Sequence, residues 1–249
     1  MAARWVGIKR RAIISVPYRR PVENKIQCRL GNFVSNKFQR NTILSASFSR
    51  WRTPRDHFLN INFEKLARYE RINVIGTSGS GKSTFSRQLA GLLNLPCYEM
   101  DRMYWKANWR AASDDELNNE LRNVVCQQKW ILDGNYTLTL PLKWEQVQLV
   151  IWLDMSFLRT VLRVTKRTIG RSLTGQEIWP ETGNRESLRT SFFSKDSVIW
   201  WAISTYRKNR RTYSDIMDGP DYPHIEFLRL KSPSDVTCCL NGIRETKKK

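Results

Sequence analysis

The chain has 249 residues, enough for one domain of moderate size with an appendage, and 41% of them are hydrophobic. Its formal net charge of +19 indicates an anionic partner such as a phosphate, a nucleic acid or an anionic lipid. No apolar run reaches the roughly 20 residues of a membrane-spanning helix. The five cysteines are scattered without a C-x-x-C pair, which argues against a zinc site and favours a cytoplasmic protein.

The basic charge is concentrated at the N-terminus. Residues 1–55 contain thirteen Lys and Arg residues and a single acid, Glu23. Hydrophobic periodicity is absent up to about residue 67, so we predict a poorly ordered basic extension over 1–68 and a folded domain over 69–249. A transit peptide and a nucleic-acid-binding arm are the alternative interpretations of this extension.

The folded domain begins with a strand, a glycine-rich loop and a helix. Apolar residues predict a buried strand at 71–75 and an amphipathic helix at 83–93. The loop between them fits the phosphate-binding pattern G-x-x-x-x-G-K-[ST]. Its glycines let backbone N–H groups converge on phosphates, and the helix N-terminus adds partial positive charge. The predicted nucleotide-binding residues are Gly76, Thr77, Ser78, Gly79, Ser80, Gly81, Lys82, Ser83 and Thr84.

Strands and helices alternate through the rest of the chain. Ser113 and Glu116 form a capping-box pattern, and Ser234 is the expected cap of the last helix. Apolar strands that alternate with helices predict an α/β fold of the P-loop NTPase class, a five-stranded parallel sheet with helices on both faces. The later strands are expected at 96–100, 129–132, 147–153 and 225–230, the helices at 113–128, after 156, at 197–217 and from 234, and a long loop from 171 to about 194.

Three acids follow three of these strands: Asp101, Asp133 and Asp154. The carboxyl ends of parallel strands meet at one edge of a sheet, where ligands bind. We therefore expect the acids to lie beside the phosphate loop, with Lys82 neutralising phosphate charge. Ser83 and Asp133 are the predicted Mg²⁺ ligands. Asp154 is the alternative carboxylate, unless it only complements a helix dipole.

Arginines recur every four residues at Arg163, Arg167 and Arg171, which places them on one helix face. Stacked like charges repel one another unless an anion lies between them. The functional interpretation is a catalytic row that stabilises charge on a transferred phosphoryl group, and the alternative is a solvated basic face. Arg185 belongs to a second group of cations in the following loop.

Several motifs resemble one family. The stretches 71–83, Glu99-Met100-Asp101, Asp133-Gly134-Asn135-Tyr136 and 184–187 are similar to the adenylate-kinase-like P-loop proteins, and more narrowly to the bacterial group called adenylate kinase or DNA-topology-modulation protein. The resemblance covers about 71–245. It implies an acceptor-binding segment after the second strand, a helical lid after the fourth, and phosphoryl transfer. In nucleoside-monophosphate kinases a Pro-Arg pair follows the Asp-Gly; Asn135 and Tyr136 stand here instead.

The acceptor site is expected around Asp101, which could orient or deprotonate a hydroxyl group. Trp105 either stacks on a ring of the acceptor or packs in the core. The remaining predicted acceptor-binding residues are Asn135, Tyr136 and Arg185.

Together these motifs predict a monomeric kinase that uses ATP and Mg²⁺ to phosphorylate a small molecule or a nucleotide, with no membrane partner. The alternative is a regulatory or DNA-associated P-loop ATPase that hydrolyses ATP slowly. A DNA-associated protein would use the basic extension and lose affinity steeply with salt.

Overall fold

The computed structural model describes residues 61–187, 191 and 197–248. Most of the expected basic extension therefore lies outside the described residues. The described part starts with the short helix α2 (Phe63–Leu66), which packs against the last helix, α10 (Pro233–Thr246). The contact is close: a Cβ added to Gly242 of α10 would lie 2.7 Å from ring carbons of Phe63.

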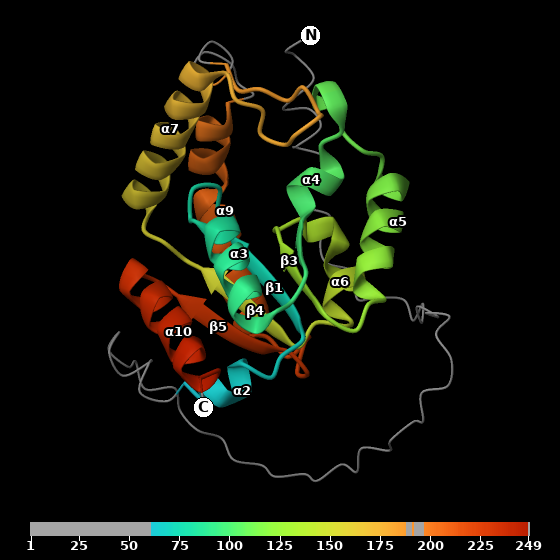
Figure 1. Ribbon diagram of the computed structural model, residues 1–249, viewed down its shortest axis with the longest axis vertical. Coiled ribbons are helices and arrows are strands. Elements are labelled where there is room, and N and C mark those ends of the chain that lie inside the picture. Colours follow the sequence, from blue (N-terminus) through green and yellow to red (C-terminus); the bar gives the residue numbers. More distant parts are fainter. Residues whose placement is uncertain (1–60, 188–190, 192–196, 249) are drawn as a thin grey trace. The chain divides into compact units, whose positions relative to one another are not determined.

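A five-stranded sheet forms the centre of the domain (Figure 1). Its strands are β1 (Arg71–Gly76), β2 (Cys97–Glu99), β3 (Trp130–Asp133), β4 (Leu149–Leu153) and β5 (Glu226–Leu230). They are ordered β2-β3-β1-β4-β5, and every pair is parallel. In this order β1 is central, so the loop that follows Gly76 emerges between the ends of β3 and β4. The predicted fold class is confirmed.

Helices cover both faces of the sheet. One face carries α3 (Lys82–Leu93) and α10, while α5 (Asp114–Val125), α6 (Leu140–Trp144) and α9 (Val198–Asp218) contribute to the cluster on the other. The long helix α7 (Phe157–Thr174) packs against α9. None of the helices in the described part of the chain has both the length and the apolar character needed to cross a bilayer.

Five short elements are absent from the sequence expectations. They are α2, which lies within the expected extension 1–68, α4 (Met100–Tyr104), the turn η2 (Ala107–Trp109), η3 (Thr137–Thr139) and α6, into which η3 leads. The strand expected at 96–100 ends at Glu99, so Asp101 lies in the first turn of a helix. The helix α7 continues to Thr174, past the expected start of the long loop, and Gly175 ends it with a positive φ of 59°. Short helices with few periodic residues give little signal in the sequence.

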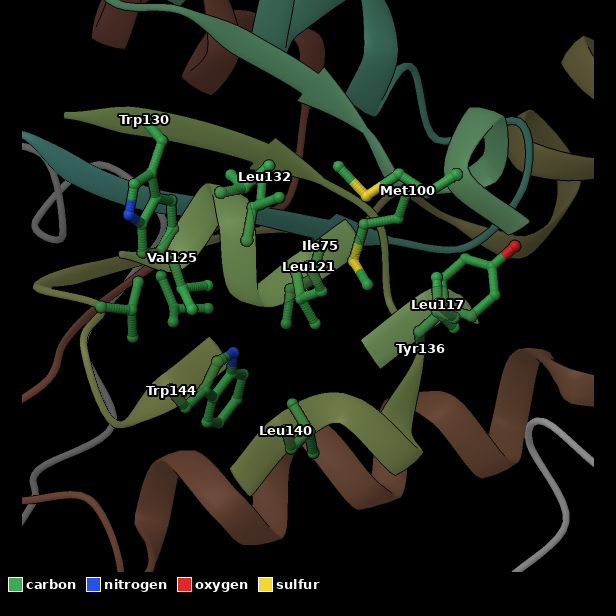
Figure 2. Close-up of a cluster of buried hydrophobic side chains, with 14 of the residues drawn as sticks. Ile75, Met100, Leu117, Leu121, Val125, Trp130, Leu132, Tyr136, Leu140 and Trp144 are labelled. Atoms are coloured by element: carbon green, nitrogen blue, oxygen red, sulfur yellow. The ribbon is translucent and has the colours of Figure 1, made fainter. Parts of the chain in front are cut away.

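The larger hydrophobic cluster lies between the sheet and α4, α5, α6 and α9 (Figure 2). Leu132 and Trp130 of β3 point into it, toward Leu121 and Val125 of α5. Trp144 of α6 is fully buried, and its ring contacts Tyr222 edge-on at a centroid distance of 5.0 Å. Large aromatic residues thus fill the core, as the composition of the chain indicates.

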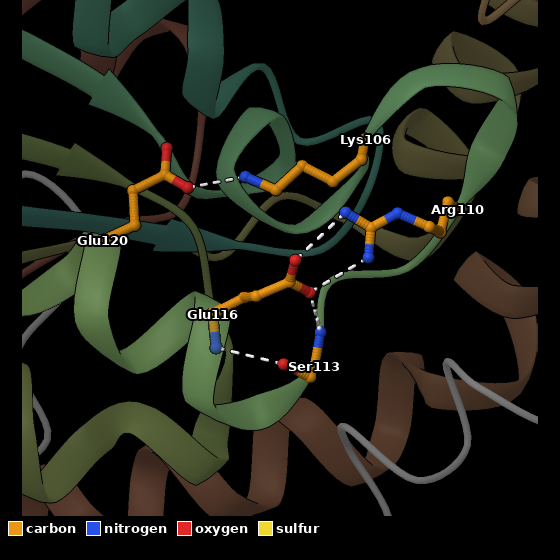
Figure 3. A network of polar contacts seen from close by, with 5 residues as sticks. All are labelled: Lys106, Arg110, Ser113, Glu116 and Glu120. Carbon is orange, nitrogen blue, oxygen red and sulfur yellow. Dashed lines mark hydrogen bonds and ion pairs between the residues drawn. The ribbon is translucent and has the colours of Figure 1, made fainter.

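The predicted capping box at the start of α5 is confirmed (Figure 3). The Glu116 N–H donates to Ser113 Oγ at 3.1 Å, and the Ser113 N–H donates to Glu116 Oε2 at 2.7 Å. Both nitrogens of the Arg110 fork also donate to Glu116. The Arg110 guanidinium and the Ser113 N–H together lower the pKa of Glu116 to about 2.

The predicted cap of the last helix was wrong by two residues. Ser232, not Ser234, is the N-cap of α10: its Oγ accepts the Asp235 N–H at 3.1 Å, and Asp235 Oδ2 accepts the Ser232 N–H at 2.9 Å. Pro233 takes the first helical position, where a missing N–H costs nothing. The pair Ser232 and Asp235 has the spacing of a capping box, with Asp in place of Glu.

Ser232→Ala is expected to reduce the free energy of unfolding by about 1 kcal/mol, because it leaves helix N–H groups without a partner. Ser234→Ala, two residues away in the same helix, is the matched control and should change it by less than about 0.5 kcal/mol. Urea denaturation followed by circular dichroism measures both. Equal losses in the two variants would contradict the assignment of the cap.

Candidate active site

The glycine-rich loop wraps around the N-terminus of α3, at the carboxyl edge of the sheet. Gly81 is the N-cap of α3 and has a φ of 95°. Gly79 has a φ of 89°, and a Cβ on it would lie 2.5 Å from the Thr160 carbonyl oxygen of α7. Residues other than glycine rarely adopt such φ values, and there is no space for a side chain at Gly79. The loop therefore needs these glycines both for its own turn and for its contact with α7.

A cavity of about 470 Å³ opens beside this loop. The loop and the first turns of α3 form one wall, and α7 contributes Arg163, Arg167 and Arg171 to it. The beginning of α10 forms a further part through Pro233, Val236 and Thr237. A positively charged cavity at a helix N-terminus suits a polyphosphate. The loop residues that line it are Gly79, Ser80, Gly81, Lys82, Ser83 and Thr84.

The three arginines of α7 do lie along one side of the loop. Arg163 Nη1 is 3.4 Å from the Ser80 carbonyl oxygen, and Arg167 Nη2 is 3.2 Å from Ser78 Oγ. Most of the Arg167 guanidinium lies among protein atoms although the residue keeps exposed surface, and this desolvation, with the neighbouring Arg171, lowers the pKa of Arg167. Arg171 pairs with Glu186 at 3.4 Å. The basic face of α7 thus lines the cavity, although Arg163 and Arg167 also keep surface exposed to solvent.

Asp133 lies at the end of β3, next to the start of α3. Its side chain is buried, and Oδ1 has no hydrogen-bond partner in the described structure. Burial raises the pKa of Asp133, while Lys82 and a hydrogen bond from the Ser83 hydroxyl act in the opposite direction. A buried carboxylate with an unsatisfied oxygen needs a counter-charge. Lys82, Ser83 and Asp133 are therefore neighbours, as the sequence indicated.

These oxygens fit a magnesium ion. Mg²⁺ prefers hard oxygen ligands, and it commonly takes one or two from the protein and the rest from water and phosphate. Ser83 and Asp133 offer a hydroxyl and a free carboxylate oxygen. In the described part of the chain no cluster of three or more His, Cys, Asp or Glu residues could form a protein-only metal cage.

Asp154, the alternative carboxylate, pairs with two arginines. Its Oδ2 accepts bonds from Arg229 Nε and Nη2 at 3.0 and 2.6 Å, and Arg210 Nε lies 3.2 Å away. The Asp154 side chain is 3% exposed, and Arg229 also stacks over the Trp152 ring at 4.2 Å. Asp154 thus ties β5 and α9 to β4, which leaves Asp133 as the carboxylate available to a metal.

The five residues predicted to bind the acceptor do not form one group. Asp101 and Tyr136 do meet: the Tyr136 hydroxyl donates to Asp101 Oδ1 at 2.9 Å. Trp105 is only 3% exposed and packs edge-on against Tyr104 and Trp109, a placement that favours the core interpretation. Arg185 is exposed and pairs with Glu177 at 3.6 Å.

Asn135 is bound to the phosphate loop. Its Oδ1 accepts the Gly76 N–H at 2.9 Å, and its Nδ2 donates to the Gly76 carbonyl oxygen at 2.8 Å. Both ends of the amide are used in this pair of bonds. The arrangement favours a role in fixing the start of the loop, and the sequence motif gave no sign of it.

The segment between α7 and α9 docks on the segment after α4. Asn184 is fully buried; its Oδ1 accepts the Trp109 N–H at 2.6 Å, and its Nδ2 donates to the Lys106 carbonyl oxygen at 3.0 Å. The Asn108 N–H donates to the Thr182 carbonyl oxygen at 3.0 Å. The Trp109 and Trp179 rings are 6.3 Å apart. These contacts hold the 177–185 segment to the side of the molecule that carries Asp101.

Comparisons with known proteins add little to this description. No protein-family model and no curated protein sequence matches the chain. The structure is similar to a gluconokinase from Sinorhizobium meliloti 1021, at 15% identity and a TM-score of 0.40 over 72% of this chain and 94% of that one. It is also similar to a shikimate kinase from Bacteroides thetaiotaomicron, at 14% identity and a TM-score of 0.42 over 72% of this chain and 99% of that one. A shikimate kinase from Aquifex aeolicus vf5 is similar at 15% identity and a TM-score of 0.41 over 72% of this chain and 96% of that one. The strand order and the geometry of the glycine-rich loop, not these likenesses, assign the chain to the P-loop α/β fold.

Proposed function

We propose that the protein is an ATP- and Mg²⁺-dependent phosphotransferase that moves the γ-phosphoryl group of ATP to a hydroxyl group of a small acceptor. One observation carries the proposal: the phosphate loop with Lys82 and the arginine row of α7 line the same cavity. Phosphoryl transfer needs little covalent help from a protein, but it needs positioning and positive charge around the transferred group. The cavity supplies both.

The residues of the site have different roles in this reaction. Backbone N–H groups of the loop and Lys82 bind the β- and γ-phosphates. Ser83 and Asp133 hold Mg²⁺, which when bound neutralises charge on these phosphates. Arg163 and Arg167, fixed against the loop, stabilise the charge that spreads over the γ-phosphoryl oxygens during transfer. Arg171, which pairs with Glu186, connects this row to the segment that follows α7.

Asp101 is the proposed general base. It accepts the proton of the acceptor hydroxyl while the hydroxyl oxygen forms a bond to the γ-phosphorus, and the bond from that phosphorus to the β,γ-bridging oxygen breaks to release ADP. The Tyr136 hydroxyl, which donates to Asp101 Oδ1, orients the carboxylate. The segment 175–187 is the proposed lid, since its contacts with Lys106, Asn108 and Trp109 bring it over the acceptor side.

The strand order and the motifs from Gly76 to Ser83 and from Asp133 to Tyr136 support the adenylate-kinase-like subtype as the finer proposal. A nucleoside monophosphate is not the favoured acceptor. Asn135 is bound to Gly76, and Tyr136, not an arginine, directly follows it. A monomer in the cytoplasm completes the proposal, because the scattered cysteines favour a reducing compartment.

ADP release by the full chain tests the proposal, measured with Mg-ATP against a panel of nucleoside monophosphates, sugars, polyols and hydroxy acids. We expect a slow basal rate that rises at least about tenfold with one class of acceptor and disappears when EDTA removes Mg²⁺. A Mg²⁺-dependent rate that no acceptor raises would contradict the kinase and favour the slow ATPase.

A further inference from the structure

Lys143 is a buried lysine close to the phosphate site, and the proposed chemistry does not use it. It lies in the short helix α6, and its side chain is 0% exposed. Its Nζ donates to the Asn135 carbonyl oxygen at 2.9 Å and to the Gly134 carbonyl oxygen at 3.3 Å. None of the ion pairs within the described residues includes it. Burial lowers the pKa of Lys143 to about 7.

Burying a lysine in this place reduces the stability of the fold unless its hydrogen bonds compensate for the loss of hydration. Removing an amine from water without a carboxylate partner carries a large desolvation penalty, and an apolar side chain of the same length would fill the space at lower cost. What distinguishes Lys143 from Met is a set of N–H donors. Both recipients belong to the turn that directly follows Asp133.

That turn is tightly constrained. A Cβ on Gly134 would lie 2.7 Å from Met100 Cβ, so the backbone passes directly against α4. Asn73 Nδ2 donates to the Leu132 carbonyl oxygen at 2.9 Å and to that of Gly134 at 3.2 Å. Trp144, the neighbour of Lys143, donates its Nε1–H to Asn73 Oδ1 at 2.9 Å. Two adjacent residues of α6 therefore reach this turn, one directly and one through Asn73.

This turn is also hydrogen-bonded to the phosphate loop. The Asn135 backbone carbonyl is bound by Lys143, and the Asn135 side chain bonds both the N–H and the carbonyl oxygen of Gly76. A continuous series of hydrogen bonds thus runs from the Lys143 ammonium through Asn135 to the first residue of the loop. A buried network of this kind stabilises one arrangement when all of its members are satisfied.

We propose that Lys143 is a positioning residue that fixes the turn after Asp133 and, through Asn135, the start of the phosphate loop. The inference rests on the proposed function only in taking this loop as the phosphate-binding element. Lys143 does not touch the phosphates, and it acts on their binding by restricting Asn135 and Gly76.

Lys143→Met tests this role, because it keeps the length of the side chain and removes its N–H donors. We expect the affinity for ADP, measured by calorimetry, to fall about tenfold or more. In hydrogen exchange, the Gly76 amide should lose protection while amides in the centre of β4 keep theirs. Lys143→Gln retains two donors and should restore part of the affinity. Lys129→Met, at a surface lysine paired with Glu70, is the control and should bind ADP like the wild type.

A double-mutant cycle separates positioning from general stability. If Lys143 acts through Asn135, the loss of ADP affinity in Lys143→Met combined with Asn135→Ala should be close to that of Asn135→Ala alone. Fully additive losses, or wild-type affinity with unchanged Gly76 protection in Lys143→Met, would overturn the proposal.

The wild-type protein gives a second test that needs no variant. Its Gly76 amide should exchange slowly with solvent even without nucleotide. If Lys143→Met does not fold, this measurement replaces it, and exchange as fast as that of an exposed loop would overturn the proposal. Failure of the wild type to bind ADP would instead contradict the proposed function, and the difference in Gly76 protection between the wild type and the Lys143 variants would still test the role of Lys143.

Discussion

Lys82→Ala is expected to lower acceptor-dependent ADP release by about 10²–10³-fold. Lys82 is the first residue of α3, it lies in the wall of the cavity, and its charge reaches the buried carboxylate of Asp133. Among the residues of the phosphate-binding motif itself, 76–83, Lys82 is the one cation. The loss should appear in kcat and in the affinity for ATP, since the lysine contacts phosphates in the ground state and in the transition state.

The fold should tolerate this change, because Lys82 is only partly buried. Thermal unfolding should therefore occur within a few degrees of the wild type. Lys166→Ala on α7 is the matched control: it removes an exposed positive charge near the arginine row but outside the lining of the cavity. Near-normal turnover in Lys82→Ala, or an equal loss in Lys166→Ala, would refute the assignment of the phosphate site.

Asp133→Asn and Asp154→Asn are expected to have opposite effects, although both acids follow a strand of the same sheet. Asp133→Asn should abolish Mg²⁺-dependent turnover and leave the free energy of unfolding unchanged or slightly raised. Burial raises the pKa of Asp133, so its charge destabilises the fold in the absence of a metal. Asn keeps the shape of the side chain without that charge.

Asp154→Asn should instead lower the free energy of unfolding by about 3 kcal/mol, because it leaves Arg229 and Arg210 without their shared carboxylate. At a temperature where the variant remains folded, its turnover and its Mg²⁺ requirement should stay close to those of the wild type. Denaturant unfolding measures the stability of both variants, and a Mg²⁺ titration of activity measures their metal requirement. A Mg²⁺ requirement that changes in Asp154→Asn but not in Asp133→Asn would reverse the assignment.

Much of the fold could be predicted because its signals are local. The phosphate loop is a contiguous pattern, each strand is a short apolar run, and the capping box of α5 involves residues three positions apart. The alternation of strands with helices then restricts the sheet to a parallel arrangement. The pair Ser83 and Asp133 followed from the same reasoning, since parallel strands end at one edge.

The remaining site features depend on contacts between distant parts of the chain. Asp133 and Asp154 look alike in the sequence, and they are distinguished by the contacts that Asp154 makes with Arg210 and with Arg229, 75 residues away. Asn135 was assigned to an acceptor because its contact with Gly76 spans 59 residues and has no sequence pattern. Lys143 gave no signal because α6 is too short for a periodic pattern. The Ser232 cap, in contrast, has a local sequence pattern, Ser-Pro-x-Asp, so the expectation of Ser234 was wrong although the signal is local.

The segment 175–187, the proposed lid, docks on backbone that is strained where it receives the segment. Asn108 and Trp109 have φ values of 55° and 57°, although neither is a glycine. Left-handed conformations cost roughly 1–2 kcal/mol per residue, and bulky side chains adopt them rarely. The hydrogen bonds with Thr182 and Asn184 compensate for this cost only while the lid is docked. Undocking would release Asn108 and Trp109 to ordinary conformations, so under the proposed function the docked arrangement stores part of the free energy that opens the lid for the departure of product.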